Sequence, residues 1–228
     1  MRPFTILLLL IAFTSGFAQT HEIKASQFND IDIFGPFKVK LVKAAASRAE
    51  IDYHGIDPDD VIIRCSGDEL QIKIRNNGLF DYNDHHDRPR AVVTIYYVSL
   101  ENIEIKGGAS LSAVDPVVAP KLTVVGRMGA EVRLQLQVKA LKLESSMGSE
   151  VELSGTADVA DFKARMGAEI DASRLKCQEV TASASMGADV RVFAEKELNA
   201  SATFGASISC KGNPAHKHTS GFFGADVN

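Results

Sequence analysis

Four carboxylates recur at one position of a repeated motif, and they are the side chains of this sequence most able to do chemistry. They are Glu131, Glu150, Glu169 and Asp189, and each lies three residues after a methionine. If the copies stack as strands of one sheet, neighbouring carboxylates lie about 4.8 Å apart. That spacing is close to the ~5–5.5 Å that separates the two carboxyl groups of a retaining glycosidase. A stacked row could also hold a cation or bind a ligand.

The repetition of this row argues against catalysis. An acid and a base need surroundings that push their pKa values apart, whereas these carboxylates are copies in nearly identical surroundings. Basic residues near the row would offset the like-charge repulsion, and these are Arg127, Arg133, Arg165 and Arg191. We interpret the row as an exposed polar surface, with a cation- or ligand-binding row and a catalytic pair as alternatives. We expect no enzyme activity.

Two histidine groups are the other residues that could bind a metal. Asp84-His85-His86-Asp87 is dense, but adjacent residues rarely point at one ion, and zinc sites need wider spacings. His216 and His218 have strand spacing but no third ligand nearby in the sequence. No nucleophile elbow, phosphate-binding loop or Cys-x-x-Cys pair is present. The sequence therefore predicts solvated histidines, no metal and no cofactor.

The motif that carries the carboxylates repeats with a nearly fixed period. Its glycines are separated by 21, 19, 19, 20, 18 and 19 residues, and they stand at positions 108, 129, 148, 167, 187, 205 and 224. Such a period is typical of a solenoid, in which each unit buries its apolar edge against its neighbours. The apolar residues of each unit alternate with polar ones, which indicates short half-buried strands. A glycine at the corner of each unit predicts an all-β fold, a parallel β-helix with coils of about 19–20 residues.

Equivalent residues of successive coils form a column. Counting back along the chain in steps of two from the Met or Phe that precedes each glycine predicts which columns face inward. A small-residue column (Gly126, Ser145, Ala164, Ala184, Ala202) and an apolar column behind it are expected to be buried. The same counting places the Met and Phe residues of the motif inside, as a continuous core ladder. These residues are Met128, Met147, Met166, Met186, Phe204 and Phe223.

Three cysteines, Cys65, Cys177 and Cys210, leave a single disulfide open on their count alone. Cys210 falls in an inward column with Leu134, Leu153, Ala172 and Val192. We therefore predict that Cys210 is a small buried side chain rather than half of a disulfide.

The first residues have the features of a secretory signal peptide. Arg2 precedes an apolar run over residues 6–13, and small residues end at Ala18. The apolar run is too short to span a bilayer, and we expect no transmembrane segment in the mature chain. The predicted division is a signal peptide at 1–18 and one domain at 19–228, with irregular coils over 19–106 and regular coils over 107–228. A separate small β-sandwich is the alternative for the irregular half. The net charge of −4 argues against nucleic acid as a partner.

The chain resembles the auto-transporter adhesin, head GIN domain family, which is common in Bacteroidetes. The resemblance rests on the leader, on an opening pattern (Phe28, Ile31, Ile33, Gly35, Phe37, Val39) and on the repeated Gly-Ala units. It implies a right-handed parallel β-helix, export to the periplasm, outer-membrane surface or exterior, and an adhesin role. We expect a non-enzymatic envelope protein that binds a glycan or protein ligand, with Glu131, Glu150, Glu169 and Asp189 on its binding surface. A carbohydrate-active enzyme or glycan-binding module of the envelope is the alternative.

Overall fold

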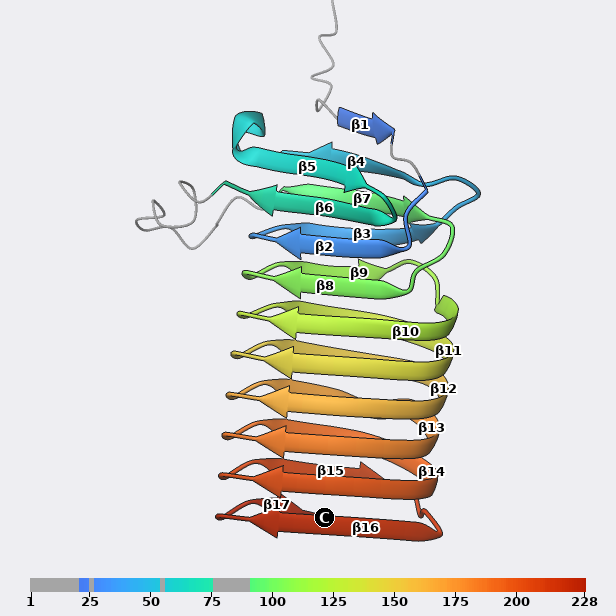
Figure 1. Ribbon diagram of the computed structural model, residues 1–228, viewed down its shortest axis with the longest axis vertical. Coiled ribbons are helices and arrows are strands. Elements are labelled where there is room, and N and C mark those ends of the chain that lie inside the picture. The colour runs from blue at the N-terminus through green and yellow to red at the C-terminus, as the bar shows by residue number, and fades with distance from the viewer. Residues whose placement is uncertain (1–20, 25–26, 54–55, 76–90) are drawn as a thin grey trace, which may run out of the picture.

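The protein is a single stack of β-coils (Figure 1). The structure is a computed structural model that describes residues 21–24, 27–53, 56–75 and 91–228. Within these ranges all strands belong to one sheet, wound into about seven turns of about 19 residues. The near strands run leftward and the far strands rightward as the chain descends in Figure 1, so the coil is right-handed. The predicted right-handed parallel β-helix is confirmed.

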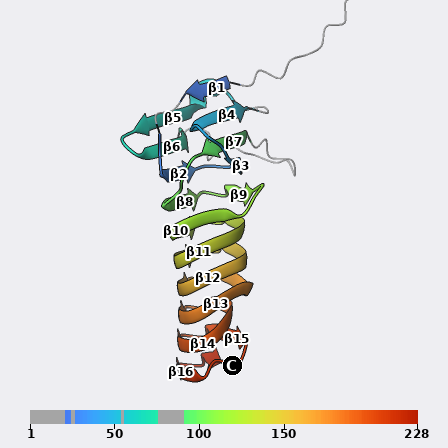
Figure 2. The same ribbon diagram turned by 90° about the vertical axis from the view of Figure 1, so that its right-hand side faces the viewer.

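The regular coils are built from long strands that curve from one face of the stack to the other (Figure 2). They are β10 (Val117–Arg127), β11 (Glu131–Ser146), β12 (Glu150–Arg165), β13 (Glu169–Ser185) and β14 (Asp189–Thr203), followed by β15 (Ser207–Lys211), β16 (His216–Phe222) and β17 (Asp226–Val227). Each pairs in parallel with the next coil, so like residues stack. Val132 lies beside Val151, and Val151 lies beside Ile170.

Each coil turns sharply at its Met-Gly or Phe-Gly pair, where both residues have positive φ. The φ angles are 54–56° at the six Met and Phe residues and 66–73° at the glycines that follow them. This turn keeps the backbone ladder continuous around the corner. The Gly129 N–H donates to the Met147 carbonyl at 3.1 Å, and the Gly148 N–H donates to the Met166 carbonyl at 3.2 Å. A left-handed residue other than glycine costs about 1–2 kcal/mol, so these corners are strained.

The Met and Phe side chains lie outside the coil, so the predicted interior ladder is wrong. Their exposed fractions run from 40% at Met128 to 77% at Phe223. Counting by twos assumes an extended backbone, and two successive left-handed residues break that alternation. The inward residue of the corner is instead the alanine after the glycine, or Ser149 in one coil, and each of these is buried except Ala225 in the last coil, which is partly buried.

The core contains small and aliphatic side chains from both faces of each coil. The predicted inward columns of the regular coils are buried, including Ala164, Leu153 and Val192. A second bend has its own glycine in two coils, Gly155 and Gly212, with φ near 105°. A Cβ at Gly155 would lie 2.0 Å from the Leu136 carbonyl oxygen, so only glycine fits.

The N-terminal coils do not stack in chain order. Their strands are β1 (His21–Lys24), β2 (Asp30–Phe34), β3 (Lys38–Lys43), β4 (Arg48–Asp52), β5 (Val61–Ser66), β6 (Glu69–Ile74), β7 (Val92–Tyr97), β8 (Asn102–Lys106) and β9 (Ser110–Ala113), with a short 3₁₀ turn at Pro58–Asp60. The β2–β3 coil lies between the β6–β7 coil and the β8–β9 coil. Antiparallel pairs of β4 with β7, β1 with β4 and β5 with β6 lie at this end of the stack (Figure 1).

The last coil has polar residues at inward positions. Lys217 lies beside Leu198 and Thr219 beside Ala200, and both polar side chains are exposed. The predicted signal peptide at 1–18 lies outside the described residues. Among the residues that are described, no helix has the length and apolar character to cross a membrane.

Candidate binding surface

The structure places the four predicted carboxylates in one row, directly after the sharp corner. Glu131 lies beside Glu150, Glu150 beside Glu169, and Glu169 beside Asp189 in the parallel ladder. Ser207 and Asp226 continue the row through the last two coils. The side chains point outward and are exposed or half-exposed. The prediction of an aligned outward row is confirmed in its geometry, and its role in binding stays a prediction.

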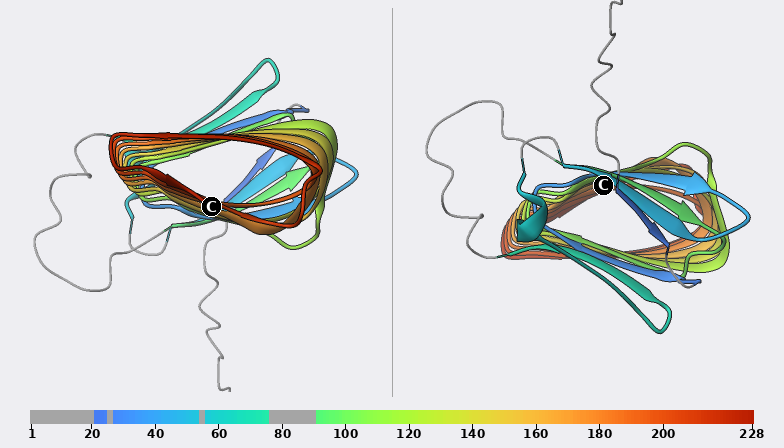
Figure 3. Two further views of the ribbon diagram at one scale, coloured as in Figure 1. Left: turned by 90° about the horizontal axis from the view of Figure 1, so that it is seen from below. Right: turned by 90° about the horizontal axis from the view of Figure 1, so that it is seen from above.

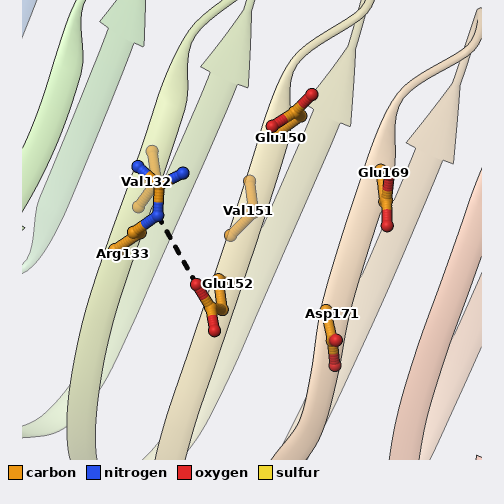
Figure 4. A pocket seen from close by; sticks show the side chains of 7 residues that line it. All are labelled: Val132, Arg133, Glu150, Val151, Glu152, Glu169 and Asp171. Atoms are coloured by element: carbon orange, nitrogen blue, oxygen red, sulfur yellow. Dashed lines mark ion pairs between the residues drawn. The ribbon is translucent and has the colours of Figure 1, made fainter.

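A second outward row runs beside the carboxylates, two residues further along each strand. It contains Arg133, Glu152, Asp171, Arg191 and Ser209, paired in that order. Figure 4 shows the two rows on one open face, with Arg133 reaching Glu152 across the coils. A shallow depression between the rows is lined by Val132, Arg133, Glu150, Val151, Glu152, Glu169 and Asp171. The site is therefore a flat, charged face and not a deep cleft.

Two arginines form ion pairs with most of the carboxylates on this surface. Arg133 lies 3.2 Å from Glu131 and 3.5 Å from Glu152. Arg191 lies 2.8 Å from Glu169 and 3.2 Å from Asp189. Burial lowers the pKa of Arg191, but the carboxylates of Asp189, Glu169 and Asp171 outweigh it and raise the pKa overall. Arg191 therefore remains a fixed positive charge between acidic neighbours.

Asp171 and Glu150 differ in how their charges are compensated. Burial raises the pKa of Asp171, but the hydrogen bonds from Ser173 and the nearby arginines lower it overall. Glu150 has no ion pair or side-chain hydrogen bond to any residue within the described ranges. It is the one member of the carboxylate row that faces the depression without a charged partner.

Metal binding has no support in the described part of the chain, where no group of three or more His, Cys, Asp or Glu side chains is arranged to hold an ion. The Asp84–Asp87 cluster lies outside the described residues. His216 and His218 are exposed on β16, as predicted for solvated histidines.

Cys177, and not Cys210, is the fully buried thiol. Cys210 lies at the predicted inward position beside Val192, but it is only half-buried because it lies near the end of the stack. The prediction of complete burial for Cys210 is therefore wrong. Neither cysteine forms a disulfide. Burial raises the pKa of the Cys177 thiol to about 12, with smaller contributions from Glu195 and Cys210.

Sequence reasoning missed two features. The first is the exposed Met/Phe ridge, meaning the corner side chains of Met128, Met147, Met166, Met186, Phe204 and Phe223. The consistent Met-Gly order was the available signal, because a left-handed residue pair commonly ends in glycine.

The second missed feature is a buried ion cluster around Asp32, which lies 2.8 Å from Lys106 and 3.0 Å from Lys73. The cluster forms between residues of coils that are far apart in the sequence, so no local sequence pattern predicts it. Burial alone would raise the pKa of Asp32, but the two ammonium groups together lower it.

Comparison with known proteins agrees with this fold. The family model described as "Putative auto-transporter adhesin, head GIN domain" matches residues 27–214. No functionally curated protein matches the chain. A "putative adhesin" from Bacteroides fragilis is 21% identical over 91% of this chain and 94% of its own, with a TM-score of 0.78.

Two further solved structures show the same architecture. A "putative adhesin" from Parabacteroides merdae is 17% identical, with 92% of this chain and 95% of that one covered and a TM-score of 0.70. A "putative lipid binding protein" from Parabacteroides distasonis is 20% identical, with 92% and 96% covered and a TM-score of 0.66. At these identities the likeness concerns the fold alone.

Proposed function

Since the chain belongs to the auto-transporter adhesin, head GIN domain family, we propose that it is an exported, non-enzymatic binding protein of the cell envelope. Its ligand is an extracellular glycan or protein. The ligand lies along the double row of charged side chains on the regular coils, with Glu131, Glu150, Glu169 and Asp189 at its centre. Export rests on the leader-like residues 1–18, and cleavage after Ala18 would leave Gln19 as the first residue.

The single observation that supports this proposal is the in-register repetition of mixed charge over consecutive coils. Carboxylates recur at one strand spacing on an open face (Figure 4), and the second row beside them adds Arg133 and Arg191. A ligand with its own repeat can make the same contact several times on such a face, so weak contacts add without a deep pocket. Glu150 is the best-placed contact, because its hydrogen-bonding capacity is not used by a neighbour.

The first experiment screens the purified mature protein on an array of glycans and matrix proteins. Glu150→Gln together with Glu169→Gln should weaken binding to any ligand found. The matched control is Glu179→Gln with Glu197→Gln, a pair of carboxylates that are also neighbours in consecutive coils but lie on the second half of their strands. Equal loss in both double variants would show that net charge, and not this face, governs binding.

A glycosidase is the competing function, and the same carboxylates test it. Catalytic acids and bases act as a unit, so removing one member usually abolishes turnover. We expect no release of reducing ends from acidic or neutral polysaccharides by the wild type. Turnover that disappears with Glu150→Gln or Glu169→Gln alone would overturn the non-enzymatic proposal.

A further inference from the structure

The Met/Phe ridge is an apolar line on the outside of the molecule. Each coil is flattened, with two faces meeting at narrow edges (Figure 3). The ridge follows one of these edges, where the strand tips align at the left of Figure 1. The ridge has six side chains, one per coil, and each is called a rung below. At a spacing of about 4.8 Å between rungs the ridge is roughly 24 Å long. At its lower end the rings of Phe204 and Phe223 stack with centroids 5.1 Å apart, and exposed Phe222 widens the apolar surface.

Neither the fold nor solubility requires apolar residues on this ridge. The corner backbone is left-handed, which asparagine or glycine adopts with less strain than methionine or phenylalanine. The side chains leave 40–77% of their surface exposed, so they add little to the core. A strained backbone position that carries exposed apolar side chains six times is typical of a contact surface.

We propose that this surface is the contact between two copies of the chain, which lie side by side and parallel. The charges on either side of the ridge support a second copy as the occupant. The residue before each of the first five rungs is a cation or a hydroxyl, and these are Arg127, Ser146, Arg165, Ser185 and Thr203; Phe222 precedes the sixth. The residue three positions after each rung is a carboxylate, or Ser207 in the fifth coil.

A two-fold axis parallel to the solenoid brings these different flanks together. Each rung then meets the same rung of the partner, and the flank before the rung faces the partner's flank after it. Arg127 faces the partner's Glu131, Ser146 the partner's Glu150, and Arg165 the partner's Glu169. Antiparallel packing would place the carboxylate flanks against each other, and like charges across an interface disfavour that arrangement.

The narrow ridge buries little area, so the dimer belongs to the weak, transient class of interfaces under about 1,200 Å². Its strongest contacts are expected at Phe204, Phe222 and Phe223, because aromatic side chains have the largest apolar area to bury at an interface. The carboxylate flank is shared with the proposed ligand face, whereas the apolar corner residues belong to the dimer contact alone. Variants of the corner residues therefore test the dimer separately from ligand binding.

The first test measures the dimer fraction of the mature protein against concentration by sedimentation velocity. Met147→Asn with Phe204→Asn should lower the dimer fraction several-fold while leaving the circular dichroism spectrum unchanged. Val118→Asn with Val159→Asn is the control, because these exposed apolar side chains lie away from the corner. A wild type that remains monomeric at every concentration would overturn the proposal. If that monomer binds neutral phosphatidylcholine vesicles through the ridge, the ridge contacts lipid and not a second copy.

A charge exchange tests the parallel register. Arg165→Glu alone places two carboxylates opposite each other, and Glu169→Arg alone places two guanidinium groups opposite each other. Each variant should therefore dimerise less than the wild type, and an equimolar mixture of the two should recover the dimer. Disulfide formation gives a second measure of register. In the variant Met128→Cys, and separately in Met186→Cys, the new cysteines of two copies should form a disulfide with each other. The wild type is the control, because it shows how much cross-linking comes from the native cysteines. Cross-linking only between position 128 of one copy and position 186 of the other would refute the parallel arrangement.

Discussion

Replacing Met147 by asparagine tests the corner assignment most directly. Met147 has a φ of 56° and leaves 47% of its surface exposed, and Gly148 follows it. The variant Met147→Asn creates an Asn-Gly pair, which is the preferred sequence for two successive residues with positive φ. Leu153→Ala in the following strand is the comparison, because Leu153 is fully buried at an inward position.

The magnitudes of the two changes are well separated. Asparagine relieves part of a left-handed strain of about 1–2 kcal/mol. Full burial of a methionine stabilises by about 1.5–3 kcal/mol, and Met147 is only about half-buried, so roughly 1 kcal/mol of packing is lost. These effects oppose each other, and Met147→Asn should change the free energy of unfolding by less than about 1 kcal/mol. Leu153→Ala should cost about 2–5 kcal/mol.

Urea unfolding followed by far-ultraviolet circular dichroism measures both variants. We expect the midpoint of Met147→Asn to stay near that of the wild type and the midpoint of Leu153→Ala to fall clearly. Similar losses in the two variants would mean that Met147 packs in the core. That result would refute both the turn geometry and the idea that the ridge is free to contact another molecule.

Three further predictions test other parts of the fold. Gly155→Ala should lower the free energy of unfolding by more than about 3 kcal/mol, because backbone strain of order 1–3 kcal/mol adds to a clash with the Leu136 carbonyl. Gly148→Ala meets open space and should lower it by about 1–2 kcal/mol. Thermal melts distinguish the two variants, and equal losses of stability would contradict the geometry of the second bend. Cys177, with a pKa of about 12, should be alkylated by iodoacetamide at pH 8 only after unfolding, as peptide mass spectrometry would show; labelling of the native protein would disprove its burial. Because folding lowers the pKa of Asp32, its charged form stabilises the native state above about pH 4, and this contribution is lost as the pH falls through the lower native pKa. Stability should therefore decline less steeply below pH 4 in Asp32→Asn than in the wild type, and parallel curves would argue against the ion cluster.

The regular half of the fold was predictable because local signals repeat in it. The spacing of the glycines fixed the coil length, and two-residue alternation fixed which side of each strand is buried. Columns such as Val132, Val151 and Ile170 then stack because equal coil lengths align equal positions. The carboxylate row followed from the same alignment, and the register confirms it.

The failures came from the places where local alternation stops. Alternation describes extended backbone only, so it misplaced Met147 and its equivalents at a left-handed corner. It also gave no information about pairing between distant segments. The β2–β3 coil is inserted between coils that come later in the chain, and the Asp32 cluster exists only because of that insertion.

A repeated fold also changes how a functional site must be sought. Where coils repeat the same residues at the same positions, their surroundings are nearly alike, and this does not favour chemistry that needs two groups with different pKa values. Binding does not need that distinction, because identical weak contacts add along the stack. The informative positions are those that depart from the repeat: Glu150, which lacks the arginine partner of its neighbours, and the Phe204–Phe223 stack, where aromatic rings replace methionine. The first departure is charged and lies on the flank that the ligand face and the dimer contact share, whereas the second is apolar and lies only on the ridge. The two proposed contacts therefore overlap at the carboxylates and are distinguished by the aromatic rings.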